Sequence, residues 1–429
     1  MFQQSAQHVA SYYAEHSPEL WQPRPPLAGE LDCEVLIVGA GFSGLHTALR
    51  LVAAGQRVVL IEASRIAWAA SGRNGGQAIL GWSSDMPPLE SDLGLEGARR
   101  LWDGMRWAAQ ELRELPQRHG FDCDYRAGHL WTAVLPRRVA LLHEWQQAAS
   151  HKWGYDALRF IPRAELPEWI ASARYQAGLF DPNAAHLNPL KLAYGLAAAI
   201  ERAGGQIHEQ TRALSYRQTS AGYQVETAQG RIRCGALVLA CNAYLDGLDQ
   251  EVASRVLPVG TYQVATVPLG AERAAALLPQ NSCVTDNQFV LDYFRLTPDQ
   301  RLLFGGGCTY LGGLPQDIRG ATRPFLERVF PQLRGVALEY AWGGHIDLSL
   351  RRTPDIGRRG QLYWLQGYSG HGVLPTLAAA RAVGAALLGD ASELALYQQL
   401  RTPRFPGGQR LAAPLEALGK AWYRLRDAI

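Results

Sequence analysis

The chain has 429 residues, 47% of them hydrophobic and 19% charged, which is enough apolar sequence for a large core in about two domains. The formal net charge is +3 without a lysine or arginine run, and the six cysteines form no C-x-x-C pair. We therefore expect no nucleic acid partner, no metal and no disulfide framework. The first residues do not form a signal peptide, and no later run has the ~20 apolar residues of a membrane span, so we expect a cytoplasmic protein.

The first part of the chain alternates between strand and helix after a polar, aromatic leader at residues 1–33. The expected elements are a buried strand at 34–38, a turn at 39–44, a helix at 45–54 and a second buried strand at 57–61. The second strand ends at Glu62. This order of elements predicts the start of an α/β domain.

The next elements indicate a second domain. Residues 89–121 repeat apolar side chains at spacings of three and four, which predicts a long helix that leaves the first domain. Asn188 caps a helix at 189–203 that begins with Pro189. Further strands are expected at 206–209, 223–227, 236–240, 261–267, 289–296, 301–304 and 362–365, with a helix at 375–388 before an amphipathic tail. The short strands between 256 and 340 predict the sheet of the second domain.

The first turn has the G-x-G-x-x-G pattern of a dinucleotide-binding turn, and its setting between a strand and a helix is the one this pattern requires. Its residues are Gly39, Ala40, Gly41, Phe42, Ser43 and Gly44. Gly39 permits the turn, Gly41 lets the backbone approach a pyrophosphate, and Gly44 lets helix and strand pack closely. Glu62, followed by Ala63, is placed to accept hydrogen bonds from a ribose. The sequence therefore predicts a bound dinucleotide.

Two further segments help to distinguish FAD from NAD as the dinucleotide. Small and polar residues after the second strand would let a loop run along a flat cofactor, and the candidates are Ser71, Gly72, Arg73, Asn74, Gly75 and Gln77. Near the C-terminus, glycines before a helix leave N–H groups free for an electron-rich acceptor such as a flavin pyrimidine oxygen. These candidates are Gly344, Gly367, Tyr368, Ser369, Gly370, His371 and Gly372, with Leu214 and Ala240 completing the set. The alternatives are a glycine-rich surface turn and an ordinary capped helix.

Together, the turn, the SGRNGGQ segment and the WGGHID…RRTPDIG…GYSGHG run resemble the gamma-glutamylputrescine oxidases and their relatives in the FAD-dependent glycine oxidase/D-amino-acid oxidase (DAO) superfamily. The YYAE…W leader and the FPGGQRL…AWYRLRD tail extend the resemblance over nearly the whole chain. It implies an α/β, DAO/glutathione-reductase-like fold, with a discontinuous Rossmann-type FAD-binding domain and an antiparallel-sheet α+β substrate domain. The expected FAD-binding domain is 34–88, 186–255 and 341–429, and the substrate domain is 89–185 and 256–340.

The resemblance also implies a reaction. Hydride passes from the amine-bearing carbon to flavin N5, the imine hydrolyses to an aldehyde and ammonia, and O2 reoxidises the flavin to give hydrogen peroxide. Sarcosine-oxidase relatives carry a flavin-linking cysteine and an oxygen-activating lysine. Here residues 348–355 hold no cysteine and 301–304 hold no lysine, so we expect non-covalent FAD. A quinone or another carrier stays open as the electron acceptor.

Candidates for substrate contact are Tyr262, Gln263, Tyr293 and Arg295 on the expected second sheet, and His345 and His371 in the flavin-side motifs. Arg295 can pair with a carboxylate such as that of a gamma-glutamyl group. Each of these residues has a purely structural alternative. The expected function is oxidation of a gamma-glutamylated or related amine in polyamine or amine catabolism. A D-amino-acid or N-methyl-amino-acid dehydrogenase, and a flavin-binding regulatory protein without turnover, are the alternatives.

Overall fold

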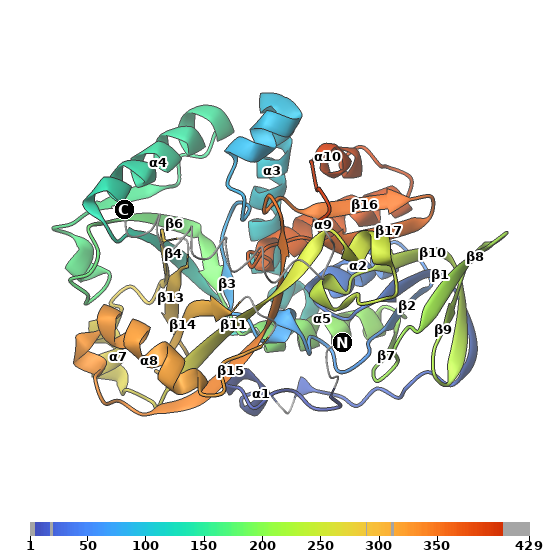
Figure 1. Cartoon of the computed structure of the whole chain (residues 1–429), viewed down its shortest axis with the longest axis horizontal. Helices are drawn as coiled ribbons and strands as arrows, with labels where there is room; N and C mark the ends of the chain where they lie inside the picture. The colour runs from blue at the N-terminus through green and yellow to red at the C-terminus, as the bar shows by residue number, and fades with distance from the viewer. Residues whose placement is uncertain (1–4, 18–19, 289, 310–312, 406–429) are drawn as a thin grey trace.

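The computed structural model describes residues 5–17, 20–288, 290–309 and 313–405, which form two sheets with helices around them (Figure 1). The expected amphipathic tail lies outside the described residues. No helix within the described ranges has both the length and the apolar character needed to cross a membrane. The fold class is α/β, as the sequence predicted.

The first sheet has eight strands, and parallel pairing of its central strands gives it the doubly wound form. Six strands follow the order β16 (Asp355–Arg359), β17 (Leu362–Gln366), β10 (Gly230–Leu239), β1 (Gly29–Val38), β2 (Val58–Ile61) and β7 (Gln206–His208). The hairpin of β8 (Ser215–Thr219) and β9 (Gly222–Glu226) extends from β10. The apolar end of β1 lies between β2 and β10, where Val35 pairs with Val58 and Ala236, so it is buried on both sides.

The helices next to the first sheet are α2 (Phe42–Ala53), α3 (Pro87–His119), α5 (Pro189–Arg202) and α9 (Val373–Leu387). The long helix α3 was expected to leave the first domain, but it packs against α9 and α5. Asn188 caps α5 as predicted, since its side chain accepts hydrogen bonds from the N–H groups of Leu190 and Lys191 at 3.1 and 3.2 Å. The short helix α10 (Leu394–Gln399) lies beside β16 (Figure 1), and the short helix α6 (Gln250–Ala253) is joined to β16 by the ion pair of Glu251 with Arg359.

The second sheet has nine strands and is mostly antiparallel. Its order is β15 (Leu338–Ser349), β11 (Val256–Thr266), β14 (Leu302–Thr309), β13 (Asp292–Leu296), β12 (Cys283–Asp286), β4 (Arg126–Ala133), β6 (Ala177–His186) and β3 (Gln77–Ala78), with β5 (Arg159–Pro162) paired to β6. Three helices accompany it: α4 (Val139–Trp153) near β4 and β6, and α7 (Ala271–Leu277) and α8 (Ile318–Val329) at the lower left of Figure 1.

The expected domain boundary at residue 341 falls inside β15. This strand pairs with β11 from Leu338 to Ser349, so the glycines of WGGHID lie within the second sheet instead of opening a return to the first. β3, inside the expected first segment, also pairs in the second sheet. We propose to place the boundary after Ser349, where the chain enters β16.

Candidate active site

A cavity of about 1650 Å³ lies between the two sheets, with wall residues from both. Gly39, directly after β1 of the first sheet, and Tyr293, on β13 of the second, both line it. Pockets for a single small molecule usually have about 300–1,000 Å³. The cavity therefore has room for a dinucleotide together with a second ligand.

The turn after β1 is shaped for close backbone approach. Gly39 has a φ of +108°, and a Cβ there would lie 2.6 Å from the carbonyl oxygen of Ala240. A Cβ at Gly44 would lie 2.0 Å from the carbonyl oxygen of Gly39, so no side chain fits between helix and strand. Gly41 precedes α2 without a capping side chain. The helix N-terminus thus meets the cavity as a site for a phosphate group.

Glu62 stands at the end of β2, on the cavity wall beside the turn. Its Oε2 accepts a hydrogen bond from the Ala40 N–H at 2.9 Å, and its Oε1 accepts one from the Ser64 N–H at 2.8 Å. Burial raises the pKa of Glu62 to about 7, and the nearby Glu209 carboxylate adds to the rise. A ribose that donates its hydroxyl hydrogens would favour the charged form. The geometry fits the role expected from the sequence.

The loop at 70–77 is braced by its own side chains. Ser71 Oγ accepts a hydrogen bond from the Phe42 N–H at 2.9 Å and so connects the loop to α2. Asn74 Nδ2 donates to the carbonyl of Ser71 at 2.9 Å, and its Oδ1 accepts from the Gly76 N–H at 2.7 Å. These bonds hold the loop against the turn, which makes the two segments one continuous cradle for a flat cofactor.

The same loop also contacts the second sheet. Arg73 Nη1 donates to the carbonyl of Gly343 on β15 at 3.2 Å. A Cβ on Gly75 would lie 2.7 Å from Cε2 of Tyr293, so the Tyr293 ring packs directly on the loop. The loop is therefore the point at which the cofactor cradle meets the sheet that covers it.

The segment at 367–372 forms another part of the wall. Tyr368 Oη and Ser43 Oγ are 2.8 Å apart, which joins this segment to the first turn of α2. The buried Asp347 carboxylate accepts hydrogen bonds from the N–H groups of Gly367 and Ser369, and burial raises the pKa of Asp347 to about 6. Asp347 lines the cavity and was not predicted, although it ends the WGGHID motif.

His371 also lies on this wall. Its Nε2 is 2.9 Å from the carbonyl oxygen of Ile79, which can only accept, so Nε2 carries the proton. Burial lowers the pKa of His371 and favours the neutral ring. Nδ1 then keeps its lone pair and can accept a hydrogen bond.

Most residues expected at the cofactor line the cavity. They are Gly39, Gly41, Phe42, Ser43, Glu62, Ala63, Ser71, Arg73, Asn74, Gly75, Gln77, Leu214, Ala240, Gly344, Tyr368, Ser369, Gly370, His371 and Gly372. Four others do not reach the wall, namely Ala40, Gly44, Gly72 and Gly367. Contact of any of these residues with a cofactor stays a prediction.

The six candidates for substrate chemistry divide evenly. His345, His371 and Tyr293 line the cavity, whereas Tyr262, Gln263 and Arg295 do not. Tyr262 points to the other face of β11 from Gln263 because neighbouring residues of a strand alternate. Gln263 is 1% exposed, and its Nε2 donates to the carbonyl of Arg73. The 70–77 loop, called the cofactor loop below, therefore covers the Gln263 side chain.

Arg295 is 1% exposed, and its guanidinium is already engaged by other parts of the chain. It donates to the carbonyls of Gly75 at 2.7 Å and Leu187 at 2.9 Å, and to the hydroxyl of Tyr13 at 3.1 Å. The expected pairing of Arg295 with a substrate carboxylate therefore has no support in this geometry. Its bonds instead position the loop that carries Gly75.

Comparisons with known proteins agree with the cradle. The model of the DAO family, described as FAD dependent oxidoreductase, matches residues 34–386. The gamma-glutamylputrescine oxidoreductase of Escherichia coli (strain K12) is 39% identical over 425 residues, which cover 99% of each chain. The probable oxidoreductase OrdL of Haemophilus influenzae (strain ATCC 51907 / DSM 11121 / KW20 / Rd) is 34% identical and covers 98% of each chain.

Solved structures show the same fold. Glycine oxidase from Geobacillus kaustophilus has a TM-score of 0.71 at 22% identity, over 88% of this chain and 100% of that one. The glycerophosphate oxidase of Mycoplasma pneumoniae, solved with FAD bound, has a TM-score of 0.61 at 16% identity, over 87% and 97%. The chain is an FAD-dependent oxidoreductase that belongs to the DAO family.

Proposed function

We propose that this protein oxidises the primary amine of gamma-glutamylputrescine, or of a closely related amine, to an aldehyde. The observation that carries the proposal is the 39% identity to a gamma-glutamylputrescine oxidoreductase over 99% of both chains. The cavity supports it, because its wall continues well beyond the cofactor cradle to residues of α3, α4 and β6. An elongated substrate requires such a continuation.

FAD fits the residues present. The backbone of the first turn would hold the pyrophosphate, Glu62 the adenosine ribose, and the 70–77 and 367–372 segments the flavin. When bound, FAD accepts the hydride and passes two electrons to O2 or another acceptor. We propose non-covalent attachment, since residues 348–355 contain no cysteine. Release of free flavin from the acid-denatured protein is the expected result.

The chain's own residues bind and orient the amine. The neutral ring of His371 keeps a lone pair at Nδ1, so it is suited to accepting a hydrogen bond from the reacting amine and orienting it. Tyr293, held between Gly75 and Gly305, limits how the amine-bearing carbon lies against the loop. The substrate loses a hydride from carbon and a proton from nitrogen to give an imine, and water converts the imine to an aldehyde and ammonia.

The test is peroxide formation by the FAD-loaded protein with gamma-glutamylputrescine, free putrescine, glycine, sarcosine and D-amino acids, repeated with a dye as acceptor. We expect aldehyde, ammonia and peroxide in equal amounts from gamma-glutamylputrescine. Turnover with the dye but not with O2 would mean that the natural electron acceptor is not O2. A preference for D-amino or N-methyl amino acids would overturn the proposed substrate, and no turnover of any amine would favour a regulatory flavoprotein. The cytoplasmic location stays a prediction.

A further inference from the structure

One row of directly opposed residues crosses the cavity side of the second sheet. From β6 to β11 it runs through Leu179, Trp131, Thr285, Tyr293, Gly305 and Gln263. Opposed residues of neighbouring strands share a face of the sheet. Leu179, Trp131, Thr285 and Tyr293 all line the cavity. This part of the row therefore forms a continuous line of residues along one wall of the cavity.

A bound cofactor would lie at the β11 end of this row, where the 70–77 loop meets the second sheet. Gln263 Nε2 donates to the carbonyl of Arg73, and Tyr293 packs on Gly75, so both residues contact the cofactor loop. Gly305 makes this possible, because a Cβ there would lie 2.0 Å from Cζ of Tyr293. The reacting carbon of the substrate must lie at this end.

The other end lies at a distance that suits the proposed substrate. Neighbouring strands are about 4.8 Å apart, so Trp131, two strands from Tyr293, lies about 10 Å along the row, and Leu179 about 14 Å. In gamma-glutamylputrescine nine bonds separate the reacting carbon from the α-nitrogen, which is about 11 Å for an extended chain with bonds of about 1.5 Å. The α-ammonium would therefore reach Trp131, and a partner within hydrogen-bond distance of it, about 3 Å further, could stand on β6.

A buried carboxylate stands on β6, one strand beyond Trp131. Asp181 follows Leu179 by two residues on β6, lines the cavity, and is 4% exposed. Its Oδ1 accepts hydrogen bonds from the Tyr155 hydroxyl and, at 2.9 Å, from the Asn183 N–H. Asp181 makes no ion pair with any residue in the described ranges, and burial raises its pKa. A cation placed here would offset the cost of burying this charge.

Aromatic rings complete the far end. Trp102 of α3, Trp131 of β4 and Trp153 of α4 line the cavity, and the Trp102 ring packs on Tyr155, the hydrogen-bond donor to Asp181, with centroids 5.6 Å apart. Trp102 and Trp153 are 8% and 6% exposed, so their faces meet a largely dry environment. Indole faces attract ammonium groups, and the attraction grows when water is excluded.

We propose that Asp181, with Trp102, Trp131 and Trp153, binds the α-ammonium at the glutamyl end of the substrate and selects amines with a second cationic centre. The proposal rests on the proposed function and deepens it. It explains why the cavity extends to α4, far from the reacting carbon. Asp181 is then a specificity-determining residue and takes no part in the chemical step.

The test compares gamma-glutamylputrescine with N-glutarylputrescine, which has hydrogen in place of the α-ammonium and is otherwise identical. We expect the wild-type kcat/KM to be at least about tenfold higher for the ammonium compound. Asp181→Asn keeps the size and the Oδ1 acceptor, and we expect it to bring this ratio close to one. Trp131→Leu, on a different strand, should lower the ratio about threefold. Flavin content and thermal melting of each variant check the fold.

Tyr155→Phe is the matched control, because it removes a hydrogen bond to Asp181 and keeps the carboxylate. It should retain the wild-type ratio. If Asp181→Asn lowers kcat/KM equally for both compounds, Asp181 is structural and the inference fails while the proposed function stands. Absence of turnover of both compounds by the wild-type enzyme would overturn the proposed function itself.

Discussion

Hydrogen bonding and burial have opposite effects on the pKa of the Glu62 carboxyl group. Its hydrogen bonds to the Ala40 and Ser64 N–H groups favour the charged form, but burial outweighs them and raises the pKa to about 7. Ribose hydroxyls donating to the carboxylate would add further bonds to the charged form only. Protonation of Glu62 and binding of FAD therefore compete.

This competition gives a pH dependence with a definite sign. Because FAD favours the ionised carboxylate, its affinity should be constant above pH 7 and fall by up to about tenfold per pH unit below it. Titration of the apoprotein with FAD between pH 6 and 8, followed by flavin fluorescence, measures this. Glu62→Gln, which still accepts a hydrogen bond but cannot ionise, should remove the slope. An unchanged slope in that variant would assign the titration to another group.

Single residues could be predicted where their neighbours in sequence determine their surroundings. Gly39, Gly41 and Glu62 lie within about 25 residues, in one strand, turn, helix and strand unit, and they line the cavity together. Arg295 and Gln263 were expected there from alternation along a strand. Alternation gives the face of a sheet but not what covers it, and here the 70–77 loop and Tyr13 cover that face.

Elements were predictable where an apolar pattern marks them. The strand expected at 34–38 begins earlier, at Gly29, where β1 already pairs with β10, and the opposed Asp32 and Arg233 form an ion pair at 2.7 Å across the two strands. These polar residues have no apolar signature. α4 was not predicted, and it buries only Leu142, Ala149 and Trp153. The part of the cavity beyond the cofactor cradle is lined by α4 and β6. Because α4 was not predicted, there was no reason from the sequence to expect that Asp181 lines a cavity.

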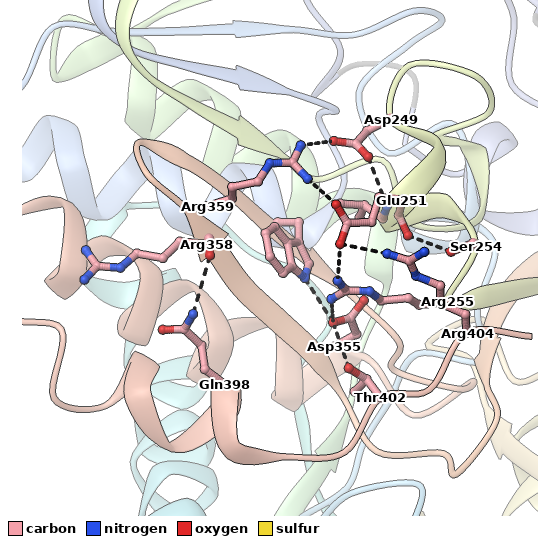
Figure 2. A network of polar contacts seen from close by, with 12 residues as sticks. Asp249, Glu251, Ser254, Arg255, Asp355, Arg358, Arg359, Gln398, Thr402 and Arg404 are labelled. Atoms are coloured by element: carbon pink, nitrogen blue, oxygen red, sulfur yellow. Dashed lines mark hydrogen bonds and ion pairs between the residues drawn. The ribbon is translucent and has the colours of Figure 1, made fainter. Parts of the chain in front are cut away.

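Figure 2 shows how charges join elements at the edge of the first sheet. Glu251 of α6 pairs with Arg255, with Arg359 of β16 and with Arg404 near the end of the described chain. The Glu251 side chain is 39% exposed, so we expect Glu251→Gln to lower the free energy of unfolding by only about 1 kcal/mol. Urea unfolding at low salt would measure this, and the loss should disappear at high salt.

The matched variant is Asp355→Ala, at a buried carboxylate of the same network. Asp355 accepts hydrogen bonds from Trp364 Nε1 at 3.0 Å and Gln366 Nε2 at 2.8 Å, and pairs with Arg255 at 3.3 Å. Removing it leaves the Trp364 and Gln366 donors without this acceptor and takes one of two carboxylate partners from Arg255, so about 3 kcal/mol should be lost at any salt concentration. Equal effects of the two variants would contradict this assignment.

At the scale of the whole molecule, the leader links the two sheets along the lower side of Figure 1. On the second sheet, the Tyr12 hydroxyl donates to Asp299 at 2.8 Å and the Tyr13 hydroxyl accepts from Arg295. On the other half, Trp21 Nε1 donates to Glu209 at 3.2 Å, and Arg24 pairs with Glu201 at 2.7 Å. The leader was predicted as a separate segment, but its buried tyrosine gives it a structural role.

Substitution of Tyr13 therefore tests whether the leader makes the two sheets unfold together. It is 0% exposed, and its ring packs on Trp342 of β15 with centroids 5.4 Å apart. Tyr13→Ala should lower the free energy of unfolding by about 3–5 kcal/mol and leave Arg295 without the Tyr13 hydroxyl, whereas Tyr13→Phe should lower it by about 1 kcal/mol.

The order in which the two halves unfold should also change. Because Arg295 holds the loop that carries Gly75, the second sheet of Tyr13→Ala should unfold at a lower temperature than the cofactor cradle. Tryptophan fluorescence and flavin release should then coincide on heating in the wild type and Tyr13→Phe but separate in Tyr13→Ala. Coincident transitions in all three proteins would mean that the sheets unfold together without the leader's contribution.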